Sequence, residues 1–129
     1  MKRKLSFLFA SVFLALAIPV AAHHSFSAVF DAEKTVEKSG TVTEVEWMNP
    51  HAWIYIDVEE DGETVNWAFE LGSPNGLIRR GWNRGTVKVG DEISISGYRA
   101  RDGSNRGNVK SITLADGREL TGNSSRNTR

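Results

Sequence analysis

Residues 47–71 read WMNPHAWIYIDVEEDGETVNWAFEL, and this stretch determines the architecture that the sequence predicts. Residues 52–59 and 64–71 both alternate between apolar and polar side chains, a pattern typical of strands with one buried face. Asp61-Gly62 lies between them and is a specific signal for a hairpin turn. The predicted core positions of the two strands are Ala52, Ile54, Ile56, Val58, Val65, Trp67, Phe69 and Leu71.

One strand is predicted before this hairpin. Thr41 to Trp47 is rich in β-branched residues, which favour strands. Its apolar positions change parity between Val42 and Val45, which indicates a β-bulge or a sharp coil of the strand. Ser39-Gly40 is predicted to bend the chain just before this strand.

A short helix and two more strands are predicted after the hairpin. Ser73-Pro74 is typical of a helix N-cap followed by proline at the first helical position. Strands follow at residues 92–98 and 108–114. The helix is predicted to bury one apolar stripe made of Leu77, Ile78, Gly81 and Trp82.

Three strands, one short helix and two further strands form the element order of the OB-fold, a five-stranded Greek-key barrel. The sequence therefore predicts an all-β domain with an OB-like barrel and a short helix between its third and fourth strands. A β-sandwich or another small barrel is the main alternative, and the position of the helix favours the OB order.

The amino-terminal residues have the organisation of a signal peptide. A basic start precedes an almost unbroken apolar run at residues 5–20, and Val20-Ala21-Ala22 offers the small residues that a signal peptidase reads. Residues 1–22 are therefore predicted to be cleaved, with a retained membrane anchor as the alternative. The basic start lacks twin arginines, which favours the general secretory (Sec) route and a periplasmic or secreted bacterial protein. Residues 23–120 then form a single domain, and residues 121–129 are predicted to be a disordered tail.

The composition excludes several classes of function. The chain has 16 basic and 16 acidic residues, and loss of Lys2, Arg3 and Lys4 leaves 13 against 16, a mildly acidic domain. Such a domain has no overall electrostatic reason to bind nucleic acid or an anionic membrane. The chain contains no cysteine, which excludes disulfides, thiol catalysis and a lipidated amino-terminal cysteine.

The bend at Asn49-Pro50-His51 is the first candidate site. His51, Trp53 and Tyr55 share the strand face opposite the core, which places an imidazole beside two aromatic rings. In an OB barrel, this strand face and the adjoining loop form the usual ligand surface, so these three residues and Asn49 are predicted to bind a sugar ring, a heterocycle or a peptide. The alternative is a structural corner in which His51 hydrogen-bonds to the backbone.

The loop between the last two predicted strands is the second candidate wall of that site. Tyr98, Arg99 and Arg101 lie at its start, and arginine recognises planar anionic groups well. The alternative is a solvated surface, because the chain has enough acidic residues to pair with its arginines.

The mature amino terminus is a candidate metal site. Cleavage after Ala22 would make His23 the first residue, with an α-amine and an imidazole that can chelate together. His24 and a distant His51 could add nitrogen donors, and a nitrogen-rich site suits Cu(II). The alternative is a pair of solvated histidines without a metal, because three histidines without cysteine are a weak pattern.

Several of these segments resemble a family of small exported bacterial proteins whose function is unknown. The similarity covers the mature chain, and its most specific parts are residues 22–26 (AHHSF), 49–53 (NPHAW) and 66–70 (NWAFE). The resemblance implies export and a single β-rich domain. It implies no activity, cofactor or catalytic residue.

We therefore expect an exported, non-catalytic binding module for a small ligand or a protein. The alternative is a Cu(II)-binding protein that uses His23, His24 and His51. The chain contains no G-x-S-x-G elbow, phosphate-binding glycine loop or H-E-x-x-H pair, so the sequence favours a binding protein over an enzyme.

Overall fold

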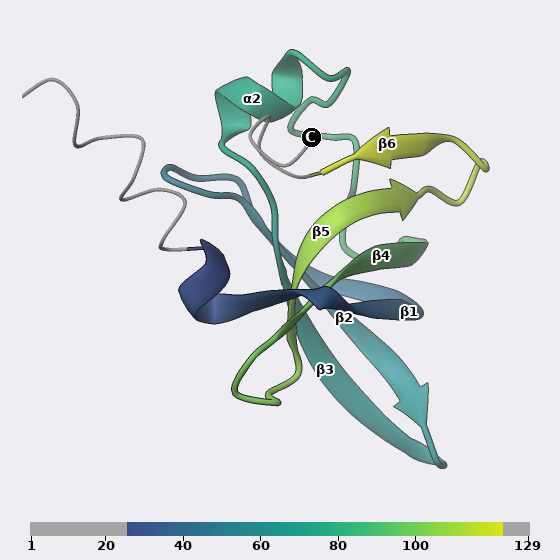
Figure 1. Cartoon of the computed structure of the whole chain (residues 1–129). Helices are drawn as coiled ribbons and strands as arrows, with labels where there is room; N and C mark the ends of the chain where they lie inside the picture. The colour runs from purple at the N-terminus through teal and green to yellow at the C-terminus, as the bar shows by residue number, and fades with distance from the viewer. Residues whose placement is uncertain (1–25, 123–129) are drawn as a thin grey trace, which may run out of the picture.

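The chain folds into a mostly β structure (Figure 1). It is a computed structural model, and it describes residues 26–122. The predicted β-rich class with a short helix after the third strand is confirmed, although the strands number six. The elements are β1 (Phe30–Glu46), β2 (Trp53–Glu60), β3 (Glu63–Glu70), α2 (Pro74–Ile78), β4 (Glu92–Ala100), β5 (Arg106–Thr113) and β6 (Glu119–Thr121).

The strands lie in the order β3-β2-β1-β4-β5-β6, and neighbours in this order are antiparallel. A further, parallel pairing joins Ala68–Glu70 of β3 to residues 106–108 of β5. The pairings β1-β2-β3-β5-β4 therefore return to β1, and each of these five strands has a partner on both sides. This parallel contact places the start of β5 beside the end of β3, which matters for the site described below.

β1 is longer than predicted and passes straight through the predicted bend at Ser39-Gly40. Residues 30–41 pair with β4, while residues 41–46 pair with β2. A Cβ atom on Gly40 would lie 2.1 Å from the carbonyl oxygen of Asp57, so this glycine allows close approach of two strands instead of a bend. The predicted bulge is confirmed as a register shift between Val42 and Glu44.

The β2–β3 hairpin follows its predicted pattern. Asp61 and Gly62 have φ angles of 51° and 81°, the left-handed conformation that a two-residue hairpin turn requires. The residues predicted to face the core are buried, except that Val65 is only partly buried. Their burial fixes which side chains of β2 and β3 point outward.

The helix begins as predicted but is shorter. The Ser73 hydroxyl accepts a hydrogen bond from the Gly76 amide at 3.2 Å, and Pro74 opens the helix. The predicted apolar stripe was wrong: the helix ends at Ile78, whose surface is 54% exposed, and Gly81 has a φ of 91° that is not helical. Leu77 and Trp82 are both buried, but Leu77 belongs to the helix and Trp82 to the segment after it.

The carboxyl-terminal boundary of the folded part lies beyond the predicted residue 120. Thr121 belongs to β6, and its carbonyl accepts a hydrogen bond from the indole Nε1 of Trp82 at 2.9 Å. The buried Gly122 donates its amide to the carbonyl of Lys110 at 3.1 Å. The predicted signal peptide and residues 123–129 lie outside the described residues. Across residues 26–122, no helix is long and apolar enough to cross a membrane.

Candidate functional site

Two aromatic side chains form the centre of the candidate site on the outer face of β2. Trp53 and Tyr55 alternate with the fully buried Ile54 and Ile56, so both rings point away from the core, as predicted. The rings are stacked, with centroids 6.5 Å apart and an angle of 26° between their planes. Both residues are half-buried, so part of each ring is available to a partner.

The neighbouring strands complete this surface through their register. Trp53 lies between Glu46 of β1 and Glu70 of β3. Tyr55 lies opposite Ala68, and Ala68 in turn lies opposite Arg106 of β5. The small Ala68 side chain therefore lies between Tyr55 and Arg106 in the register of the three strands. We call this surface the aromatic face and define it as Glu46, His51, Trp53, Tyr55, Ala68, Glu70 and Arg106.

Arg106 reaches across the aromatic face from the start of β5. Its guanidinium carbon lies 5.5 Å from the centre of the Trp53 ring, within the range of a cation–π contact. This contact depends on the parallel pairing of β3 with β5, which aligns Ala68 with Arg106.

His51 and Glu70 form a polar pair at the end of the aromatic face. The imidazole Nδ1 lies 2.7 Å from a carboxylate oxygen of Glu70, and the Glu70 side chain is 15% exposed against 44% for His51. Burial raises the pKa of Glu70, although the His51 and Arg106 charges oppose that rise. The pair holds the imidazole in one orientation and leaves its Nε2 as the nitrogen able to contact a ligand.

Tyr55 is held by the opposite edge of the face. Its hydroxyl donates a hydrogen bond to a carboxylate oxygen of Glu46 at 3.2 Å. Burial raises the pKa of Tyr55, and the negative charges of Glu46 and Glu44 raise it further, while Arg106 opposes them. The hydroxyl is therefore a hydrogen-bond donor at neutral pH, with its ring fixed against Trp53.

Residues 12–110 match the profile of a family of unknown function, DUF6152. The chain belongs to the DUF6152 family. No curated protein matches the chain. The match spans more than half of the sequence and includes every residue of the aromatic face, so the predicted membership of a family of unknown function is confirmed.

Asn49, the other ligand residue predicted near the bend, lies in the loop before β2 of the DUF6152 protein. Asn49 is exposed in the β1–β2 loop, next to Pro50, with which it forms a cis peptide bond. The loop is fixed at its end by Ala52, which donates its amide to the Gly72 carbonyl at 3.0 Å and accepts from the Leu71 amide at 2.8 Å.

The structure does not bring Tyr98 and Arg99 to the aromatic face. Tyr98 packs edge-on against Phe26, with ring centroids 5.9 Å apart. The Arg99 guanidinium lies 5.2 Å from the ring centre of Trp67, a core residue that is 1% exposed. Arg99 therefore covers one end of the core. Arg99 has the same parity in β4 as the buried Ile93 and Ile95, which places it on the core side, whereas the prediction grouped it with the following loop.

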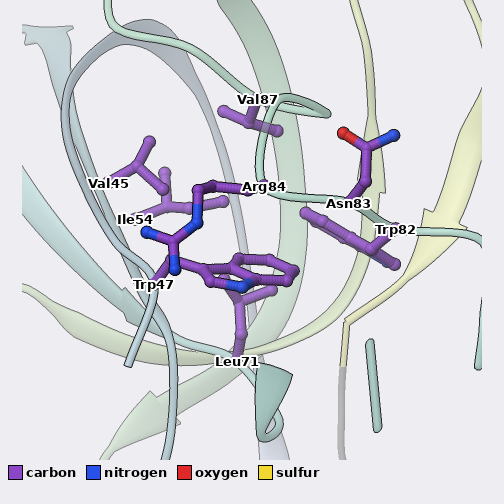
Figure 2. A pocket seen from close by; sticks show the side chains of 8 residues that line it. All are labelled: Val45, Trp47, Ile54, Leu71, Trp82, Asn83, Arg84 and Val87. Atoms are coloured by element: carbon purple, nitrogen blue, oxygen red, sulfur yellow. The ribbon is translucent and has the colours of Figure 1, made fainter. Parts of the chain in front are cut away.

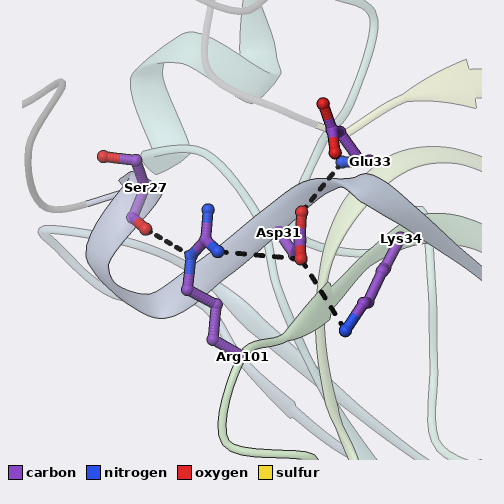
Figure 3. Close-up of polar contacts among 5 residues, drawn as sticks. All are labelled: Ser27, Asp31, Glu33, Lys34 and Arg101. Atoms are coloured by element: carbon purple, nitrogen blue, oxygen red, sulfur yellow. Dashed lines mark hydrogen bonds and ion pairs between the residues drawn. The ribbon is translucent and has the colours of Figure 1, made fainter.

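Arg101 likewise has a structural partner (Figure 3). Its Nε donates a hydrogen bond to the Ser27 carbonyl at 2.6 Å, and its guanidinium lies 3.6 Å from the Asp31 carboxylate. These contacts fasten residues 26–31 to the loop between β4 and β5.

The sequence did not identify the other walls of the site, which only strand register could have revealed. These walls are formed by Glu46, Ala68, Glu70 and Arg106.

A separate hollow lies away from the aromatic face, at the end of β1 (Figure 2). It occupies about 200 Å³, part of it open to solvent. Trp47 and Arg84 line it together with the apolar Val45, Ile54 and Leu71. The hollow is below the roughly 300 Å³ at which small-molecule pockets usually begin, which makes it a weak candidate for a ligand site.

The predicted metal site is only partly within the described residues. His51 is placed, whereas His23 and His24 lie outside residues 26–122. In that described part of the chain, no group of three or more histidine, cysteine or acidic side chains could hold a metal ion. His51 and Glu70 alone offer too few ligands, so a metal would require donors from the mature amino terminus.

Proposed function

We propose that this DUF6152 protein is an exported, non-catalytic module that binds a ring-bearing small ligand or peptide on its aromatic face. The observation that carries the proposal is the stacked pair Trp53 and Tyr55, which is partly exposed and bordered by polar groups. A planar ring can stack on such a surface, while His51, Glu70 and Arg106 hydrogen-bond to its substituents.

We interpret the fold as an OB-like barrel, and this interpretation supports the proposed site. The closed order of pairings β1-β2-β3-β5-β4 and the helix between β3 and β4 are those of an OB-fold. OB-folds bind ligands on the face of strands two and three, between the loops that follow strands one and four. Trp53, Tyr55, Ala68 and Glu70 of the aromatic face lie on these two strands, and Arg106 directly follows the second of these loops.

The proposed location is the bacterial periplasm or the exterior of the cell. It rests on the basic start, the apolar run and the small residues at positions 20–22. Amino-terminal sequencing of the protein recovered from the periplasm tests it: a start at Ala22 or His23 supports export, and an intact Met1 in the membrane fraction contradicts it.

The binding proposal is tested with the mature protein, residues 23–129, and a panel of sugars, heterocycles and short peptides. Ligand-observed NMR identifies binders, and titration gives their Kd. We expect Trp53→Ala to raise that Kd about tenfold, because an aromatic stacking contact contributes about 0.5–1.5 kcal/mol beyond burial. Met48→Ala is the matched control, since Met48 is an exposed apolar residue of the neighbouring loop. Equal losses in both variants would count against the aromatic face.

A Cu(II)-binding function is the second proposal, and the His51–Glu70 pair is the observation that favours it. Metal-ligating histidines commonly donate one ring nitrogen to a carboxylate, as His51 Nδ1 can to Glu70. His23 and His24 would supply the other nitrogen donors. Cu(II) titration of the mature protein is compared with His23→Ala and with Glu70→Gln. Micromolar or weaker binding that neither substitution changes would exclude this function.

A further inference from the structure

The charges around the aromatic face are unevenly distributed between its two edges. Glu44 and Glu46 lie on β1, beside Tyr55 and Trp53 respectively. Among residues 26–122, neither glutamate has a lysine or arginine partner at ion-pair distance. This edge of the face therefore carries two carboxylates that form no ion pair with a described lysine or arginine.

The opposite edge is close to electrically balanced. Glu70 is paired with His51, and the Arg106 charge also acts on Glu70. One carboxylate therefore stands beside one permanent cation and one imidazole on this side. Glu44, Glu46 and Glu70 against Arg106 leave an excess of two negative formal charges, not counting the His51 imidazole, and this excess lies on the β1 edge as the source of a negative field.

Two observations indicate that this field reaches the rings. Tyr55 donates its hydroxyl to Glu46, so the acidic group lies in direct contact with one ring of the stack. The other ring, Trp53, already accepts a planar cation, the guanidinium of Arg106, near its face. A planar cation on an aromatic surface gains both cation–π attraction and attraction to nearby carboxylates.

We infer that the ligand of the aromatic face is a ring or planar group that carries a positive charge, held on Trp53 and Tyr55 with the charge toward Glu44 and Glu46. This inference rests on the proposed function and specifies its ligand class. Amidines, guanidines and cationic heterocycles belong to this class. Neutral sugars and anionic rings bind more weakly.

Three ring probes of similar size but different charge test this inference. At pH 7 benzamidine is a cation, benzamide is neutral and benzoate is an anion. We expect the mature protein to bind benzamidine at least about tenfold more tightly than benzoate at an ionic strength of roughly 10 mM, with benzamide between them. The preference should shrink in about 0.5 M NaCl, because salt screens exposed charges.

Charge-neutralising variants locate the source of the preference. Glu44→Gln combined with Glu46→Gln should weaken benzamidine binding about three- to tenfold and leave benzamide almost unchanged. Arg106→Gln removes a positive charge from the face. We therefore expect this variant to bind benzoate more weakly relative to benzamide. Glu119→Gln is the matched control, because it removes the same charge from β6, which pairs with neither β2 nor β3.

The outcomes separate the inference from the function on which it rests. Equal binding of the three probes, or tighter binding of benzoate, overturns the inferred charge and leaves the aromatic face as a ring-binding site. Binding of benzamidine that Glu119→Gln weakens as much as the β1 double variant also overturns it. Failure of all three probes to bind overturns both the inference and the proposed ring-binding function.

Discussion

Gly40→Ala is the substitution that most directly probes the way β1 crosses from β4 to β2. The added methyl group would lie 2.1 Å from the carbonyl oxygen of Asp57 and 2.9 Å from its carbon. Ordinary contacts at such a site begin at 3.4 Å, so β1 and β2 must separate by more than 1 Å at this point. The obstacle is backbone, which cannot rotate away as a flexible side chain could.

The expected cost follows from what this separation disturbs. Forcing an extra methyl group into a packed site costs about 1–3 kcal/mol. Weakening one strand-pairing hydrogen bond near Thr41 and Asp57 adds about 1 kcal/mol. We therefore expect Gly40→Ala to lower the free energy of unfolding by about 3 kcal/mol, which lowers the Tm of a domain of this size by about 10–20 °C.

Urea denaturation followed by circular dichroism measures this loss. Gly85→Ala is the matched control: Gly85 lies in a loop, and its added methyl group would have ordinary contact, 3.4 Å from Asn83. We expect this control to change the free energy of unfolding by less than about 0.5 kcal/mol. If Gly40→Ala were as stable as the control, β1 would have to bend at Gly40 instead of passing close to β2.

Three further predictions address the helix, the covered end of the core and the His51–Glu70 pair. Leu77→Ala should lower the free energy of unfolding, measured by urea denaturation, by about 3 kcal/mol because Leu77 is fully buried. Ile78→Ala, at an exposed neighbour, should lower it by less than about 1 kcal/mol. Similar losses in both variants would support the continuous apolar stripe instead. Trp67→Phe should cost about 2 kcal/mol, because it removes the hydrogen bond from Nε1 to Glu60 and buried ring area under Lys38 and Arg99; a neutral effect would show that these contacts add no stability. The pKa of Glu70 is raised above its ordinary 4.5, so its contribution to stability is greatest below pH 4.5 and is lost as pH rises through the folded-state pKa. We therefore expect the free energy of unfolding of Glu70→Gln to increase relative to that of the unmodified protein as the pH of the urea titrations rises through that range. A relative decrease would contradict a pKa of Glu70 raised by burial.

Local sequence patterns were sufficient for the parts of the fold that depend on neighbouring residues. Alternation determined the buried faces of β2 and β3, and therefore placed Trp53 and Tyr55 on the outer surface. Asp61-Gly62 determined the turn, and Ser73 determined the start of the helix. Each of these features follows from the chemistry of a few adjacent side chains.

Features that depend on distant pairing could not be predicted. The sequence Ser39-Gly40 is equally compatible with a bend and with two strands that approach closely. Only the short distance between Gly40 and Asp57 in the structure distinguishes the two. Arg106 joins the aromatic face through the parallel pairing of β3 with β5, between segments more than 30 residues apart in the chain. β6 contains three residues, too few to show an alternating pattern.

The same distinction applies to the candidate site. His51, Trp53 and Tyr55 could be grouped because one strand carries Trp53 and Tyr55 and the adjoining bend carries His51. Arg99 was grouped with them through its proximity in sequence to the last loop, yet it covers Trp67 in the core. Sequence reasoning found the aromatic centre of the site, and strand register was needed for its charged edges.

The indole N–H signals of the four tryptophans provide the most direct test of the binding site. In a ¹H–¹⁵N correlation spectrum of the mature protein, titration with benzamidine should move the Trp53 signal. The Trp67 and Trp82 signals should stay in place, because their N–H groups are hydrogen-bonded to Glu60 and to the Thr121 carbonyl. A ligand that moves the Trp47 signal and leaves Trp53 unchanged would place binding in the hollow of Figure 2 and contradict the aromatic face.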